Sequence, residues 1–216
     1  TSVEQTPSGR AKYYLNLARA RDAQPNAAPP SIEWTEDCEI VWTRERSRLL
    51  RGQATGAGFV ADVTIQGKRE FVELAATRVP FERTMRLRRG TNVLEVSARD
   101  LAGRKTVRRL TWVADWNPPG LSVLQADPGP DGIRVRAIGY DDQALARIRV
   151  EGRVVADVAE QAPRSTEVAF TLPARGGRID VVDRAGNTNT CALSSADIAA
   201  LARPPVQWAS AEESGV

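Results

Sequence analysis

The feature that most constrains this chain is a strand-and-turn pattern that occurs twice, once in each half of the sequence. Val63–Lys68 and Ile148–Arg153 each place β-branched residues at alternate positions and then carry a glycine. Alternation is typical of a strand with one buried face, and the glycine supplies the positive φ that a tight hairpin turn needs. Residues 31–194 consist of such short runs between Gly, Asp and Asn, without helix-length periodicity. The pattern predicts a β-sandwich or barrel.

The same offset recurs further along and indicates an internal duplication. Met85–Leu87 matches Phe170–Leu172 at the offset that separates the two hairpin patterns, and Asp100–Gly103 matches Asp183–Gly186 at a slightly smaller one. A loop two residues shorter in the second copy accounts for the difference. A period of this length corresponds to one small sandwich domain per copy.

Proline pairs mark the boundaries of the two copies. Pro29 and Pro30 precede the first copy, and Pro118 and Pro119 precede the second. We therefore predict four segments: a helix and Pro-rich linker at 1–30, domains at 31–116 and 117–194, and a helix and tail at 195–216.

Short helices are expected at both ends. Ala11–Ala20 has helical spacing of Tyr14, Leu17 and Ala18, with Ser8 as the predicted N-cap. At the other end, Ser194 or Ser195 can cap the run 196–202, and Asp197 lies where a capping box places its acid. No stretch approaches the roughly 18–20 apolar residues of a membrane-spanning helix.

The turn motifs resemble those of bacterial Ig-like domains, the fibronectin-III-like sandwiches found in tandem on secreted and envelope proteins. The resemblance rests on Gly90-Thr91-Asn92, on Ala98-Arg99-Asp100-Leu101-Ala102-Gly103 with its counterpart Asp183–Asn187, and on Asp115-Trp116-Asn117-Pro118-Pro119. The second copy departs from it, with Gly177-Arg178 where the family has an Asn. The resemblance implies a mainly β fold of two tandem Ig-like β-sandwiches with short terminal helices. The Tyr13–Ala18 run is similar to the last helix of a tetratricopeptide array.

The composition excludes much catalytic and metal chemistry. The chain contains no histidine, which removes Ser-His-Asp and Cys-His pairs and imidazole ligands. Two cysteines cannot form a four-cysteine zinc site. We therefore expect no enzyme activity, no cofactor and no metal centre. If the two domains stack end to end, Cys38 and Cys191 lie far apart, and both are expected to be unpaired thiols; a folded-back arrangement would let them meet.

The positive charge is carried by arginine, with 27 Arg against 3 Lys and a net charge of +3. Arg86, Arg88 and Arg89 cluster in the first copy, which is modestly basic. An acidic protein or an anionic lipid surface would suit this cluster, although alternate arginines on a strand also form an ordinary solvated face. The mixture of acids and bases argues against nucleic acid.

Two further site types stay open as alternatives. The aspartates at 100, 115, 127, 131, 141, 142 and 183 could supply oxygen ligands for calcium near the domain junction, or be solvated turn residues. Among the tryptophans, Trp34, Trp42 and Trp112 are expected in the core, Trp116 at the domain junction, and Trp208 as an anchor on a partner or folded back on the second domain.

These observations predict a non-enzymatic structural or interaction protein at the periplasmic or extracellular face of the cell envelope. It would be an accessory subunit docking on protein partners in a larger, possibly membrane-embedded assembly. The expected contact residues are Tyr13, Tyr14, Leu17, Arg86, Arg88, Arg89, Ile198, Leu201 and Trp208. The alternative is a carbohydrate- or surface-binding module from a larger secreted protein, which would need a planar platform of exposed aromatic rings.

Overall fold

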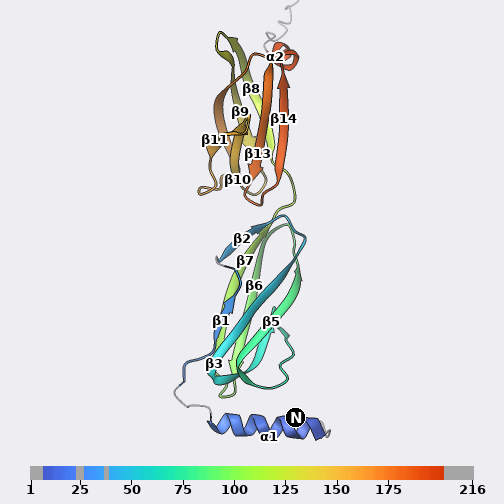
Figure 1. The fold of residues 1–216 in the computed structure, drawn as a ribbon, viewed down its shortest axis with the longest axis vertical. Helices are drawn as coiled ribbons and strands as arrows, with labels where there is room; N and C mark the ends of the chain where they lie inside the picture. Colours follow the sequence, from blue (N-terminus) through green and yellow to red (C-terminus); the bar gives the residue numbers. More distant parts are fainter. Residues whose placement is uncertain (1–6, 23–26, 37–38, 202–216) are drawn as a thin grey trace, which may run out of the picture. The chain divides into compact units, whose positions relative to one another are not determined.

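A computed structural model describes residues 7–22, 27–36 and 39–201 of the chain, and its fold is mainly β with two short helices (Figure 1). The predicted fold class is therefore confirmed. Contacts divide the chain into two compact units, Thr1–Trp116 and Asn117–Val216. Among the described helices, none is long and apolar enough to cross a membrane.

The first unit is a sandwich whose two layers share one long strand. Its strands are β1 (Ser31–Trp34), β2 (Ile40–Thr43), β3 (Ser47–Ile65), β4 (Lys68–Arg69), β5 (Ala76–Arg86), β6 (Gly90–Asp100) and β7 (Lys105–Ala114). The first part of β3 pairs with β1 and β5, and its last part pairs with β6. On its other side β6 pairs with β7, and β7 pairs in turn with β2, which runs parallel to it.

The change of layer occurs where β3 bends. The register of β3 against β5 shifts between Thr55 and Val60, and Phe59 in this stretch has a φ of 56°. Such a break lets one strand bend away from its partner and pass to another sheet. The inward side chains of both layers form one core, in which Trp112 and Leu110 are fully buried.

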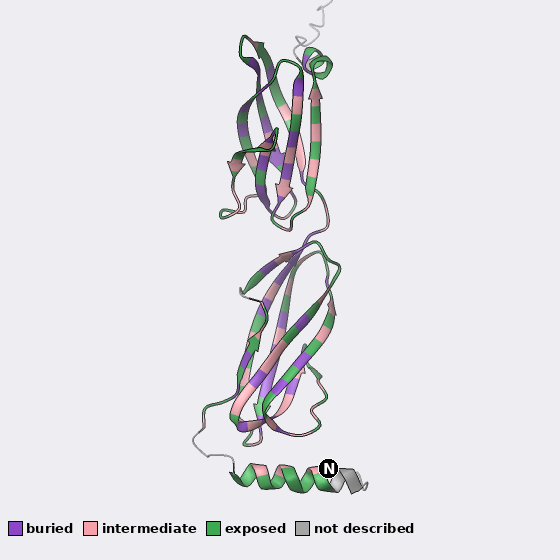
Figure 2. Cartoon of the chain, viewed as in Figure 1, coloured by how far each residue is buried: buried purple, intermediate pink, exposed green. Residues whose placement is uncertain are grey.

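The second unit is a sandwich of two separate sheets. Its strands are β8 (Gly120–Gly129), β9 (Gly132–Tyr140), β10 (Leu145–Val150), β11 (Arg153–Asp157), β12 (Ser165–Leu172), β13 (Gly176–Asp183) and β14 (Thr188–Ser194). The sheet orders are β12-β9-β8 and β11-β10-β13-β14. Leu145, Ile148 and Ile179 lie fully buried between them, and Figure 2 shows buried and exposed residues alternating along these strands.

The repeated motifs occupy equivalent places in the two units. The hairpins β3–β4 and β10–β11 turn at Gln66-Gly67 and Glu151-Gly152, and all four residues have positive φ. Positive φ at both central residues defines the turn whose twist matches that of the flanking strands. The expected hairpin turns are therefore confirmed.

The last hairpin of each unit closes on a buried aspartate. Asp100 Oδ1 accepts hydrogen bonds from the N–H groups of Ala102 and Arg104, at 3.0 and 2.9 Å. Asp183 Oδ1 accepts one from the N–H of Asn187 at 2.8 Å. The predicted Asx-type turns are present, because a short carboxylate can satisfy backbone donors that the turn leaves unpaired.

The helices are α1 (Pro7–Asp22) and α2 (Ser195–Leu201). The α1 helix is longer than the predicted run 11–20 and begins at Pro7, so Ser8 lies inside the helix and the prediction that it is the N-cap was wrong. A proline suits the first helical position because no N–H is needed there.

The predicted capping box of α2 is confirmed, with Ser194 as the cap. The N–H and hydroxyl of Ser194 donate to Asp197 Oδ2 at 2.9 and 2.6 Å, and the N–H of Asp197 donates to Ser194 Oγ at 3.2 Å. The side-chain bond and then the backbone bond from Ser194 lower the pKa of Asp197 below its ordinary 3.8.

Two glycines of the second unit test how tightly the backbone packs around them. Gly176 and Gly186 have nearly equal φ values of +91° and +93°, but a Cβ at Gly176 would run into the carbonyl of Leu193, whereas one at Gly186 meets nothing within 4 Å. We expect Gly186→Ala to destabilise the chain by about 1–2 kcal/mol. Gly176→Ala should cost about 1–3 kcal/mol more because of the clash. Denaturant unfolding measures both variants, and equal losses would contradict this packing.

The capping box should make α2 sensitive to acid. Because the folded-state pKa of Asp197 is lowered, the cap contributes its stability above pH 3.8 and loses it as the pH falls through the lowered pKa. Ser194→Ala should return the pKa of Asp197 towards 3.8. Carboxyl NMR titration of the wild-type and variant chains gives both values, and identical titrations would show that the cap does not form.

Candidate docking surfaces

The α1 helix rests on the first unit through polar side chains. Lys12 Nζ lies 3.0 Å from Glu73 Oε1, the N–H of Ala75 donates to Asn16 Oδ1 at 3.4 Å, and the Arg19 guanidinium lies 5.4 Å from the centre of the Phe59 ring. Residues 12, 16 and 19 are separated by four and three positions, so they share one face of the helix.

Three apolar side chains of α1, those of Tyr13, Tyr14 and Leu17, lie away from this face, with exposed fractions of 47, 67 and 41%. Leu15 comes three residues after Lys12 and four before Arg19, so it lies on the anchoring side, where it is 44% exposed. Most of the described helix is coloured exposed in Figure 2. A surface helix normally buries its apolar stripe against the core and leaves its polar face in water. In α1 this arrangement is inverted, and the residues available for contact include the predicted Tyr13, Tyr14 and Leu17.

Sequence reasoning missed one residue next to this helix. Phe71 is 86% exposed and lies in the loop before β5, which also supplies the helix contacts of Glu73 and Ala75. Its neighbour Val72 packs against the core. The alternation of Phe71 and Val72 in a short loop was the available signal, since only one of two adjacent side chains can face inward.

The predicted arginine cluster lies at the opposite end of the first unit from α1. Arg86 ends β5, and Arg88 and Arg89 follow it in the turn to β6; all three are exposed. Asn92 holds this turn: its Oδ1 accepts the N–H of Arg88 at 2.9 Å, and its Nδ2 donates to the Arg88 carbonyl at 2.7 Å.

One small partner surface therefore cannot contact both the arginine cluster and α1. The β5 strand begins directly after Ala75, which contacts α1, and ends at Arg86. Eleven residues of strand span roughly 33 Å at about 3.3 Å per residue.

The three predicted contact residues near the C-terminus, Ile198, Leu201 and Trp208, have different outcomes. Ile198 is only 2% exposed and belongs to the core of the second unit, where α2 packs against β8 and β14. Its side chain serves the fold, so the structure removes it from the predicted contact residues. Leu201 ends α2, but its side chain lies outside the described part of the chain, as does Trp208.

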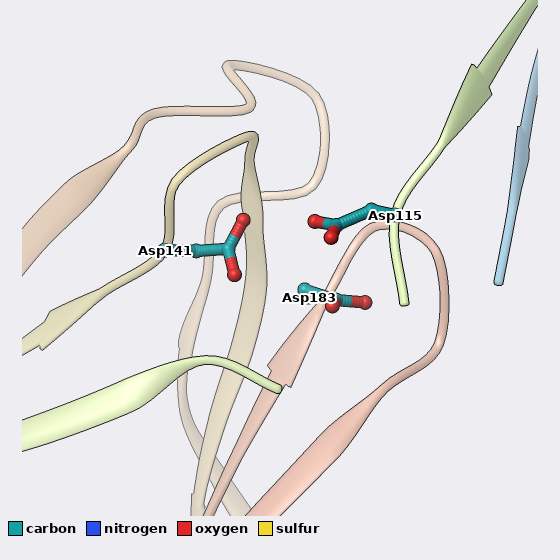
Figure 3. A group of neighbouring side chains, drawn as sticks. All are labelled: Asp115, Asp141 and Asp183. Carbon is teal, nitrogen blue, oxygen red and sulfur yellow. The ribbon is translucent and has the colours of Figure 1, made fainter. Parts of the chain in front are cut away.

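The buried aspartates already have polar partners. Asp141 Oδ1 accepts the N–H groups of Gln143 and Ala144 at 2.7 and 2.8 Å, and Asp183 accepts the N–H and side-chain amide of Asn187. Carboxylate oxygens of Asp141 and Asp183 lie within 4.8 Å of one another (Figure 3). These bonds explain why turns of the second unit retain buried acids. Calcium binding stays a prediction.

Three tryptophan rings of the first unit are covered by arginine. The guanidinium carbons of Arg108, Arg48 and Arg46 lie 4.4, 5.7 and 4.9 Å from the ring centres of Trp34, Trp112 and Trp116. The core position of Trp112 is confirmed at 0% exposure. Trp34 is half-buried and packs against that core, and Trp42 is half-buried. Trp116 packs against the first core. Trp112 is therefore buried, and a guanidinium occupies one face of each of the Trp34 and Trp116 rings.

A groove of about 570 Å³ lies along β1, β3 and β5, lined by Glu33, Trp34, Thr35, Arg51, Gly52, Gln53, Pro80, Phe81 and Glu82. Its polar side chains are already paired: Arg51 with Glu82 at 3.0 Å, and Gln53 with Glu33 at 3.1 Å. Its aromatic residues are Trp34, which lies under Arg108, and Phe81, which is 5% exposed. The groove therefore offers paired polar groups rather than an aromatic platform.

Comparisons with known proteins assign the chain to no family. No family model matches the sequence, and no curated protein matches it. Similar solved structures include the Bacteroides ovatus mixed-linkage glucan utilization locus protein SGBP-B (17% identity, TM-score 0.28, 76% of this chain and 46% of that one). The Clostridium thermocellum CbhA fibronectin(III)-like modules follow at 12% identity and TM-score 0.43, covering 75% of this chain and 91% of that one. Titin Ig tandem domains A164-A165 share 13% identity at TM-score 0.32, covering 78% and 96%.

These likenesses are too distant to argue for any activity or ligand. The chain covers less than half of the glucan-utilization protein. The sandwich architecture rests on the strand orders themselves. Cys191 is a free, half-buried thiol in β14, as predicted, and Cys38 lies outside the described residues.

Substitutions on the two faces of α1 should separate anchoring from docking. Lys12→Ala with Asn16→Ala removes one exposed ion pair and one hydrogen bond, together worth about 1–2 kcal/mol. We expect amide exchange in α1 to become roughly tenfold faster, with the sandwich unchanged. Tyr14→Ala, on the opposite face, is the control and should leave the exchange unchanged. Hydrogen-exchange mass spectrometry compares the two, and equal effects would contradict the assignment of faces.

Proposed function

We propose that this chain is a non-catalytic interaction protein that docks on a larger assembly through the outward face of α1, formed by Tyr13, Tyr14 and Leu17. The observation that carries the proposal is the inverted helix: polar residues hold it on the sandwich, and its largest apolar residues face water. Exposed apolar side chains of this size, gathered on one element, are typical of a protein contact site.

The spacing on α1 suits recognition by an apolar groove. Tyr13 and Leu17 are four residues apart, and Tyr14 and Leu17 are three apart, which is the i, i+3, i+4 pattern of helix-in-groove binding. Tyrosine is also a residue enriched among strong contacts in protein interfaces. The partner in this proposal is a protein with an apolar groove.

The wider setting is part of the same proposal. The turn motifs of both units support an Ig-like module, and we propose that it acts at the periplasmic or extracellular face of the cell envelope. We propose 31–116 and 117–194 as its two domains, which is supported by two separate buried cores. Arg88 and Arg89, on the turn held by Asn92, would make an independent contact with an acidic partner.

Co-purification tests the docking role. The triple variant Tyr13→Ala, Tyr14→Ala, Leu17→Ala should weaken binding of the partner by more than about 100-fold. The reason is that each of the three interface anchors is worth about 1 kcal/mol of binding free energy. Alanine keeps the helix, so a loss of partner is not a loss of α1. The measurement is gentle extraction of the tagged chain from source membranes, followed by mass spectrometry of stoichiometric partners.

A matched variant controls for the removal of exposed apolar residues. Leu124→Ala, Val154→Ala and Val155→Ala change three residues of the second unit with exposed fractions of 49, 51 and 39%, and should leave the partner bound. A wild-type chain that purifies alone overturns the subunit role. Equal recovery of the partner with both triple variants would place its contact elsewhere than α1.

A further inference from the structure

The β14 strand is an edge without the usual protection against strand pairing. It borders the four-stranded sheet of the second unit and pairs with β13 in unbroken register from Gly176–Ser194 to Val182–Thr188. Its sequence, TNTCALS, contains no charged residue and no proline. Exposed edges are normally protected by charge, proline or a bulge, because their free N–H and C=O groups can pair with another chain.

Other edge strands that the structure describes at more than four residues do carry such protection. The protecting residues are Pro80 and several charges in β5, Asp127 and Pro128 in β8, Arg153 and Asp157 in β11, and Glu167 in β12. The β14 edge is the exception in the described part of the chain.

The duplication supplies an internal comparison. At the offset that relates the aspartate turns, β14 corresponds to the start of β7, whose sequence is KTVRRL where β14 has TNTCAL. Lys105, Arg108 and Arg109 of β7 correspond to Thr188, Cys191 and Ala192. The β2 strand covers only Thr111–Ala114 of β7, so charge protects the remainder of that edge.

We propose that β14 is a homodimerisation edge, on which the β14 strand of a second copy of this chain pairs antiparallel. Pairing against any of the other long edges would bring a charged residue into the new ladder, whereas two β14 strands oppose each other without charge. A two-fold axis at Cys191, the middle of the seven-residue strand, places Thr190 opposite Ala192 of the second copy. The N–H of Ser194, at the end of the strand, is already bonded to Asp197 and takes no part in the new ladder. The pair joins two four-stranded sheets into one and leaves no free β14 edge, so association stops at the dimer.

The surroundings of β14 are compatible with this pairing. Thr188, Thr190, Ala192 and Ser194 are its exposed residues, and all are small. One carboxylate lies at the end of the edge, where Asp197 Oδ2 accepts the N–H and hydroxyl of Ser194 at 2.9 and 2.6 Å. On β13, Arg178 Nε lies 2.8 Å from Asp180 Oδ1, which also accepts the Thr190 hydroxyl at 2.7 Å. The charges of β13 beside the middle of β14 are therefore paired with each other.

Sedimentation velocity on the full chain over a concentration series tests the dimer. The wild-type mass should rise towards twice the monomer mass as concentration increases. Ala192→Arg introduces the residue that β7 carries at the matching position, and it should weaken association at least about tenfold by placing a charge in the new ladder. Ala169→Arg, at an exposed position of β12, is the matched control and should dimerise like wild type.

Two further measurements keep the outcome decisive. Thr188→Lys, the counterpart of Lys105, should reproduce the effect of Ala192→Arg if that variant folds poorly. In the wild type, amide exchange in residues 188–194 should slow at high concentration while exchange in 153–157 stays constant. A chain that remains monomeric overturns the proposal, as does a dimer that both arginine variants leave intact or weaken equally.

Discussion

The end of the first unit that carries α1 depends on one buried ion pair. Arg104 Nε donates to Asp100 Oδ2 at 2.7 Å, and Asp100 is only 3% exposed. The same guanidinium donates to the carbonyl of Ala27, in the segment that follows the helix. A buried carboxylate without such partners would be costly, so the turn and the linker stabilise each other.

The bend of β3 joins this network. The N–H of Leu101, next to Asp100, donates to the carbonyl of Phe59 at 3.0 Å, and the Phe59 ring in turn lies under Arg19 of α1. Gly58 leaves the space that the Asp100 and Arg104 side chains occupy. Turn, bend and helix are thus connected by specific contacts, which is why a helix with a polar inward face can have a defined position.

The sequence predicted what local rules determine. Alternating β-branched residues gave the strands, and the glycines at 67 and 152 gave the hairpins, because these choices depend on backbone geometry alone. The inverted face of α1 could not be predicted in this way. Its anchors are Lys12, Asn16 and Arg19, and their partners lie in a loop and a bend much later in the chain. Likewise, the sequence predicts Ile198 as a contact residue, and only its position in the second core shows that it is buried.

Comparison of the two copies shows where duplicated sandwiches are free to diverge. In the first unit the Asn92 side chain bonds the backbone of Arg88 in the turn after β5. In the second unit, where Arg178 stands near that position, the turn after β12 is closed by the N–H of Gly176, which donates to the Pro173 carbonyl at 2.8 Å. Both solutions satisfy the backbone, so either sequence folds. The outer edges face no such requirement, because water satisfies their backbone groups in the monomer. Their sequences can therefore differ in charge without affecting the core, and a difference in charge between equivalent edges is information about association rather than about folding.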